Sequence, residues 1–113
     1  MNAADCVQIE DRPALANVAA IARTPGLDAV FVGPADLARS FGYPGQPGHP
    51  EVVAAIDRIR HDVEGAEKPA LANFARTEAD AASLVKQGIH LVCLSTTAIF
   101  TRRLADLIAT LKQ

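Results

Sequence analysis

The hydrophobic positions of this chain follow two spacings that alternate along its length. Short, largely apolar runs at residues 6–9, 29–32, 70–74 and 91–94 each predict a β-strand. Apolar residues at helical spacing follow each run and predict amphipathic helices between and after the strands. The predicted apolar faces are Leu15, Val18, Ala19 and Ala22; Val52, Ile56, Ile59 and Val63; Leu84 and Val85; and Phe100, Leu104, Leu107, Ile108 and Leu111. We expect the last of these faces to be buried.

Proline, glycine and capping residues mark the ends of these elements. Pro13 and Pro50 suit the first turn of a helix, because a proline there gives up no helical hydrogen bond. Thr77 and Asp80 have the spacing of a capping box, and Ser95 begins a cluster that caps the last helix. A short helical turn is expected at residues 35–40, before the long Pro/Gly-rich loop at 42–50.

Strands that are apolar throughout are typical of a parallel sheet covered on both faces. Two α/β architectures fit: a small doubly wound sheet, or part of a (β/α)8 barrel. Gln8 and Glu10 share one side of the first strand, and a polar side ending in a carboxylate is typical of a barrel mouth. No Gly-x-Gly-x-x-Gly motif follows a strand, which argues against a dinucleotide-binding sheet. We therefore expect residues 1–113 to form one partial domain, half of a TIM barrel made of four β/α units with parallel strands.

Four units cannot close a barrel, which needs about 250 residues. The strands at Cys6 and Leu91 would each leave a row of unpaired backbone groups at an open edge. We expect the other half to come from a parent polypeptide, a second chain or another copy.

Composition limits the possible partners. The chain has 113 residues, 11 basic against 13 acidic, and no block of like charge, so a nucleic-acid partner is not expected. No apolar stretch is long enough to cross a membrane, and Met1–Asp5 has no signal-peptide pattern. Two cysteines, Cys6 and Cys93, are too few for a disulfide framework, so we expect them to pack within strands in a cytoplasmic protein.

Several polar residues have both a structural and a functional interpretation. Glu10 at a strand end could be a solvated loop residue or a partner of Arg12, and Asp36 could be a helix N-cap. Gln8 could be a buried amide bonded to backbone. The histidines, His49, His61 and His90, lack partners at metal-ligand spacing, so we expect surface or packing roles for them.

Three segments together carry a family resemblance: Val7-Gln8-Ile9-Glu10, Val30-Phe31-Val32-Gly33-Pro34-Ala35-Asp36-Leu37, and Gly42 to Val52 with its Pro/Gly pattern. They resemble the HpcH/HpaI aldolase/citrate lyase family, the class II pyruvate aldolases, which includes 4-hydroxy-2-oxoheptanedioate aldolase. The resemblance runs nearly end to end here but covers only the carboxyl-terminal half of that family's barrel.

The resemblance implies a divalent cation held by Glu10 and Asp36, with Mg²⁺ or Mn²⁺ favoured by the hard oxygen ligands and Co²⁺ as an alternative. Pyruvate would chelate the cation, which would stabilise its enolate while an aldehyde is released or added. Gln8 would orient the keto acid, and the amides of Ala35 and Asp36 would hold its carboxylate, with Gly33 allowing close approach. The family's general base and its arginine belong to the amino-terminal half, so we assign no catalytic residue here.

Three functions follow as hypotheses. The first is a metal-dependent carbon–carbon lyase that is incomplete without the other half-barrel. The second is an inactive fragment that still binds metal and pyruvate, and the third is a module for association. The family forms multimers, so we also expect a homo-oligomer in which the stripe at residues 99–111 docks on a neighbour. A phosphate-binding isomerase is disfavoured, because no Gly-rich phosphate loop follows the third or fourth strand.

Overall fold

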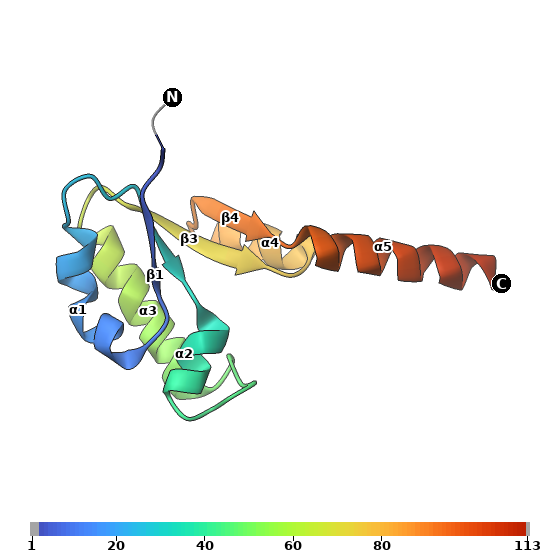
Figure 1. The fold of residues 1–113 in the computed structure, drawn as a ribbon, viewed down its shortest axis with the longest axis horizontal. Helices are drawn as coiled ribbons and strands as arrows, with labels where there is room; N and C mark the ends of the chain where they lie inside the picture. The colour runs from blue at the N-terminus through green and yellow to red at the C-terminus, as the bar shows by residue number, and fades with distance from the viewer. Residues whose placement is uncertain (1–2, 113) are drawn as a thin grey trace.

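A computed structural model describes residues 3–112, in which four strands alternate with helices (Figure 1). Met1 and Asn2, part of the segment tested for a signal peptide, lie outside the described residues. The elements are β1 (Cys6–Ile9), α1 (Arg12–Ala22), β2 (Ala29–Val32), α2 (Pro34–Ser40), α3 (Pro50–Glu64), β3 (Ala70–Ala75), α4 (Glu78–Lys86), β4 (Leu91–Leu94) and α5 (Thr96–Leu111).

The four strands form one parallel sheet in the order β1-β2-β3-β4. Cys6 pairs with Ala29, Ala29 with Ala70, and Ala72 with Leu91. A doubly wound sheet reverses its strand order at a switch point, and this order has no reversal. Right-handed crossovers between successive neighbours put the connecting helices on one face of the sheet. The prediction of four parallel strands alternating with helices is confirmed.

The hydrophobic core lies between this face and the helices. Ile9, Val30, Val32 and Leu71 of the sheet pack with apolar residues of α1 and α3, and Ile59 is fully buried among them. The predicted stripe of α3 is mostly correct: Val52, Ile59 and Val63 are buried and Ile56 is partly buried.

Local signals placed most helix boundaries correctly. α3 begins at Pro50, and α4 begins with the capping box in which Thr77 and Asp80 bond to each other's backbone. α1 begins at Arg12 with Pro13 in its first turn as predicted, and the Asp11 carboxylate caps the helix by accepting the Ala14 N–H at 2.8 Å.

The expectation that the sheet is covered on both faces is wrong for this chain. The face opposite the helices carries Cys6, Phe74 and Leu91, and all three are exposed. Cys6 therefore does not pack as predicted, and Cys93 is only half-buried. The strands have a second apolar face that the described residues leave open.

The prediction that the α5 stripe is buried is also wrong. α5 extends away from the rest of the chain (Figure 1), and Phe100 is 70% and Leu111 77% exposed. Leu104, Leu107 and Ile108 are exposed as well. The helix has the amphipathic pattern of a packed element, and residues 3–112 contain nothing that covers it. Within the same residues, no helix has the length and apolar character needed to cross a membrane.

Candidate functional site

The ends of β1 and β2 form the rim on which the predicted site residues lie. Ile9 pairs with Val32 in the sheet, and the Gly33 N–H then donates to the Ile9 carbonyl at 3.0 Å. This bond extends the pairing of β1 and β2 by one residue. Glu10 and Gly33 are therefore held beside each other at the carboxyl end of the sheet, where barrel enzymes carry their active sites.

Gly33 is packed closely against two of the predicted site residues. A Cβ atom at this position would lie 2.7 Å from Gln8 Nε2 and 3.1 Å from Glu10 Cβ. The φ angle of Gly33 is −104°, which other residues also adopt, so lack of space and not backbone conformation requires glycine here. Side-chain atoms of Gln8 and Glu10 thus lie close to Gly33 at this end of the sheet.

α2 starts directly from this contact. Gly33 is its N-cap, and the first helical hydrogen bond runs from the Leu37 N–H to the Gly33 carbonyl at 2.9 Å. The amides of Ala35 and Asp36 precede that bond, and they have no acceptor within residues 3–112. Free amides at the start of a helical turn can donate to a carboxylate.

The Asp36 carboxylate is turned toward Arg39. Its Oδ1 accepts from the Arg39 guanidinium at 3.1 Å, and the two side chains are 44% and 73% exposed. An ion pair this exposed contributes less than about 1 kcal/mol, so a cation could displace the arginine at little cost. Asp36 is a ligand candidate with a weak competitor on its own helix.

Glu10 is not paired with Arg12, which was one of its two structural alternatives, and its exposure is consistent with the other, a solvated residue. The Arg12 guanidinium lies 4.3 Å from the centroid of the Phe41 ring and donates to the Phe41 carbonyl. The Arg12 N–H donates to Ser40 Oγ, which ties the start of α1 to the end of α2. The Glu10 carboxylate is exposed and has no ion-pair partner among the described residues.

Glu10 and Asp36 are the two carboxylates that the sequence analysis proposed as metal ligands. Residues 3–112 contain no group of three or more His, Cys, Asp or Glu side chains placed to hold a metal ion. Glu10 and Asp36 would supply two hard oxygen ligands, and a cation would complete its coordination with water and substrate oxygens. That both carboxylates bind one cation remains a prediction.

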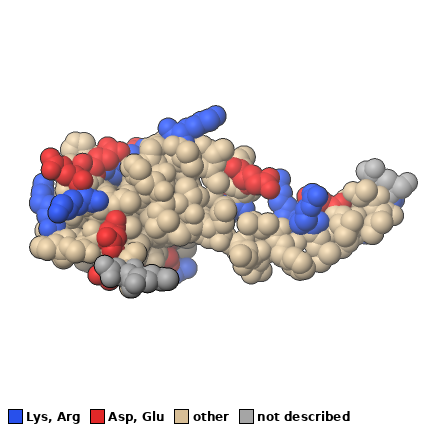
Figure 2. Space-filling view, turned by 90° about the horizontal axis from the view of Figure 1, so that it is seen from above, with Lys and Arg blue, Asp and Glu red and all other residues tan. Residues whose placement is uncertain are grey.

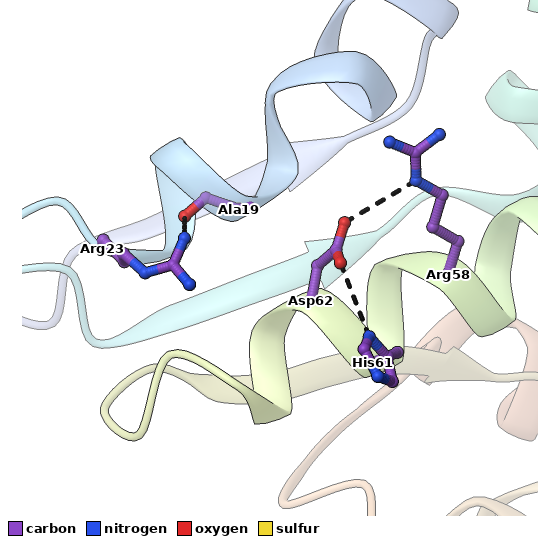
Figure 3. Close-up of polar contacts among 5 residues, drawn as sticks. All are labelled: Ala19, Arg23, Arg58, His61 and Asp62. Carbon is purple, nitrogen blue, oxygen red and sulfur yellow. Dashed lines mark hydrogen bonds and ion pairs between the residues drawn. The ribbon is translucent and has the colours of Figure 1, made fainter.

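The histidines lie away from these carboxylates. His61 is exposed on α3, with Nδ1 3.6 Å from Asp62, which also contacts Arg58 (Figure 3). The backbone N–H of His90 donates to the Leu71 carbonyl near the start of β4. His49 caps α3 by accepting the Glu51 N–H on Nδ1 at 3.3 Å.

The loop between α2 and α3 contains an ordered contact that the sequence did not predict. The Tyr43 hydroxyl donates to Glu51 Oε1 at 2.6 Å, and its ring stacks on His49 with 3.5 Å between ring centroids. The hydrogen bond to Glu51 raises the pKa of Tyr43, and desolvation and the negative charge of Glu51 raise it further. The signal available in the sequence was the placement of Tyr43 and Glu51 on either side of the helix cap His49.

The Glu51→Gln substitution should lower the pKa of Tyr43 toward its ordinary value of about 10, because the charged acceptor is lost. Tyr43 is the only tyrosine and there is no tryptophan, so the ultraviolet absorbance of tyrosinate reports on this residue alone. The raised pKa stabilises the fold at pH values below the unfolded pKa, and this contribution is lost as pH rises through the folded pKa. Glu64→Gln, at the other end of α3, is the control, and equal midpoints for both variants would contradict the contact.

The Gly33→Ala substitution should destabilise the chain by about 1–3 kcal/mol, because the new methyl group overlaps Gln8 and Glu10. Gly48→Ala, where an added Cβ has open space and no positive φ, is the matched control. Urea unfolding measures the stability of both variants. A Gly33→Ala/Gln8→Ala double variant should recover part of the stability lost in Gly33→Ala, because the Gln8 side chain is then out of the way. Equal stability of Gly33→Ala and Gly48→Ala would show that the rim is not packed as described.

Comparisons with known proteins place the chain in a family. The sequence profile described as HpcH/HpaI aldolase/citrate lyase matches residues 5–101. A crystal structure of a protein of that family from Burkholderia cenocepacia superposes with a TM-score of 0.91 and 32% identity, covering 97% of this chain and 43% of that one.

Two curated relatives are similar in sequence. A pyruvate aldolase from Rhizobium etli is 69% identical over 51 residues, which are 45% of this chain and 20% of the relative. A 5-keto-4-deoxy-D-glucarate aldolase from an Enterobacter species is 42% identical over 104 residues, covering 88% of this chain and 40% of the relative. The chain thus spans well under half the length of these relatives and matches a portion of the family's TIM-barrel structures. It belongs to the HpcH/HpaI aldolase/citrate lyase family.

Proposed function

We propose that this chain is the carboxyl-terminal half of the barrel of a divalent-metal pyruvate aldolase, a carbon–carbon lyase acting on 2-keto-acid aldols. The observation that carries the proposal is the packing of Gly33 against Gln8 and Glu10, with Asp36 in the first turn of the helix that follows. Relatives named as pyruvate and 5-keto-4-deoxy-D-glucarate aldolases support the reaction class.

The donor set suits a hard divalent cation such as Mg²⁺ or Mn²⁺, with Co²⁺ as the alternative. Glu10 is exposed and unpaired within residues 3–112, and Asp36 has only a weak competitor in Arg39. When bound, such a cation supplies Lewis-acid stabilisation of negative charge on the keto oxygen. Glu10 and Asp36 would hold it.

The other rim residues would position the keto acid. The Gln8 amide lies directly against Gly33, where it could orient the keto acid or a water. The amides of Ala35 and Asp36 would donate to the substrate carboxylate. None of these groups removes a proton from carbon, and a general base contributes about 10²–10⁴-fold to a rate. We therefore propose that the chain binds metal and pyruvate but turns over feebly or not at all by itself.

The Glu10→Gln substitution should weaken pyruvate-dependent Mn²⁺ binding by roughly 10–100-fold, because a charged oxygen ligand is replaced by an amide. Calorimetric titration of Mn²⁺ with and without pyruvate measures this. Glu67→Gln, an exposed carboxylate in the loop before β3, is the control and should leave binding unchanged. Pyruvate-dependent binding that survives Glu10→Gln would rule out the proposed ligand.

We also propose that the missing amino-terminal half covers the open face of the sheet. β1 and β4 are edge strands, and Phe74 and Leu91 are 40% and 44% exposed on the face that a closed barrel would bury. A second role, association with further copies in a homo-oligomer, is favoured by the exposed stripe of α5.

Co-expression with the amino-terminal half of the Enterobacter aldolase should give a complex in which amides of β1 and β4 exchange hydrogen more slowly. Leu91→Asp should prevent the complex, whereas Val85→Asp on exposed α4 should not. Unchanged exchange at both edges would contradict the half-barrel proposal. Sedimentation of the isolated chain checks the second role, which a monomer would contradict.

A further inference from the structure

β3 carries a buried polar residue near the level of the proposed site. Asn73 is only 7% exposed and is the one polar side chain buried in the described part of the chain. It lies on the helix face of the sheet with Leu71, because side chains alternate along a strand. Charged side chains lie on the outside, mainly over the helices at one end of the molecule and along α5 (Figure 2). Burying an amide is costly unless its polar atoms are bonded, so the contacts of Asn73 need a physical reason.

The pairing of β2 with β3 ends earlier than the pairing of β3 with β4. The first stops at the pair Phe31–Ala72. The second continues further along β3, to the pair Ala75–Leu94. β2 and β3 therefore separate at the carboxyl end of the sheet, where Gly33 begins the turn into α2.

The sequence explains why the ladder between β2 and β3 stops there. The Ala70 N–H donates to the Asp28 carbonyl at 2.8 Å, so alternate residues of β3 face β2, and Phe74 is one of them. The Phe74 N–H would next meet the Val32 carbonyl. The Phe74 carbonyl would need a donor from Pro34, which has no N–H. A further rung would therefore lack one of its two hydrogen bonds.

The Asn73 side chain binds the donor that this ladder leaves over. Its Oδ1 accepts the Phe74 N–H at 2.7 Å, in place of the Val32 carbonyl. A backbone N–H shielded from water and left without an acceptor would cost about as much free energy as a lost hydrogen bond. Because Asn73 satisfies this N–H within β3, β2 is free to turn away from the sheet into α2.

The separation of the two strands bears on the rim, because α2 carries Asp36 in its first turn. A hydrogen bond from the Phe74 N–H to the Val32 carbonyl would draw the end of β2 toward β3 and away from β1. Glu10 lies beside Gly33 on the β1 side. Such a shift would therefore move Asp36 relative to Glu10.

We propose that Asn73 is a positioning residue for the rim. By accepting the Phe74 N–H it keeps the ends of β2 and β3 apart, and it thereby fixes the start of α2, with Asp36, relative to Glu10. This inference rests on the proposed function, in which the two carboxylates hold one cation. In this role Asn73 touches neither substrate nor metal and acts only through the backbone.

The first test examines the hydrogen bond by NMR and needs no metal. Scalar coupling across the bond should connect the Phe74 amide nitrogen to the side-chain carbonyl carbon of Asn73. Asn73→Leu keeps the shape of the side chain but removes the acceptor, so the coupling should vanish and the amide signals of α2 should shift. Asn73→Asp keeps an oxygen in the same place, an acceptor in either protonation state, and should restore the coupling and the wild-type α2 signals.

Val63→Ala is the matched control for lost stability, because Val63 is buried in the last turn of α3, beside the amino-terminal end of β3. It should leave the α2 signals in place. Absence of the coupling in the wild-type chain, or α2 signals that move no more in Asn73→Leu than in Val63→Ala, would overturn the proposal.

The second test measures pyruvate-dependent Mn²⁺ binding to the full chain by calorimetry. Asn73→Leu should weaken it about tenfold, as loss of an outer positioning contact does at metal sites. Asn73→Asp and Val63→Ala should each stay within about twofold of the wild type. Equal weakening in Asn73→Leu and Val63→Ala would contradict the positioning role. If the wild-type chain binds no Mn²⁺ with pyruvate, the proposed function fails, and the NMR test still decides whether Asn73 positions α2.

Discussion

The candidate site depends on one close contact between neighbouring strands. The Gly33 N–H reaches the Ile9 carbonyl, and the missing side chain of Gly33 lets Gln8 and Glu10 lie directly against the start of α2. The hydrogen bond is made by backbone atoms, whereas the packing against Gly33 is made by side-chain atoms of Gln8 and Glu10. The carboxylate, the amide and the free backbone N–H groups therefore come from two adjacent strand ends whose relative position is fixed by sheet register.

One-sided burial explains most other features of the chain. Three connecting helices and α2 provide a core for one face of the sheet, centred on Val30, Leu37 and Ile59, which are fully buried. The other face and α5 retain apolar surface that this core cannot reach. A single sheet with open edges has no other means of burying both faces, which is why barrels of this class close on themselves.

Much of the fold could be predicted because its signals are local. Apolar runs located the strands, and residues such as Pro50 and Thr77 marked helix starts through backbone chemistry within one turn. The burial of α5 could not be predicted in this way. Amphipathic spacing at Phe100 and Leu104 shows that a helix face needs a partner but not whether the same chain supplies it.

The site was predictable in part for the same reason. The residue types at Gln8, Glu10 and Gly33 were identified from the sequence, but their mutual contact is a property of register between two strands. The Asp36–Arg39 pair has ordinary i, i+3 spacing and was overlooked because Asp36 was considered only as a cap or a ligand. The Tyr43–Glu51 contact requires a loop to turn back on a helix, and composition alone does not encode that path.

The groups at the rim of this chain could bind a cation and a carboxylate, but none of them is assigned to proton transfer. Glu10 and Asp36 supply negative charge where a cation would balance it, and the α2 amides supply positive character where a carboxylate would lie. In the proposed site, carboxylates and free amides near one strand end would together suit a 2-keto acid chelated to a cation. Proton transfer requires a further group that the resemblance assigns to the other half-barrel. Closing the barrel would also lower the local dielectric constant around the carboxylates, and each electrostatic contact at the rim would then become stronger. In the proposed barrel, the two halves would thus depend on each other energetically as well as chemically.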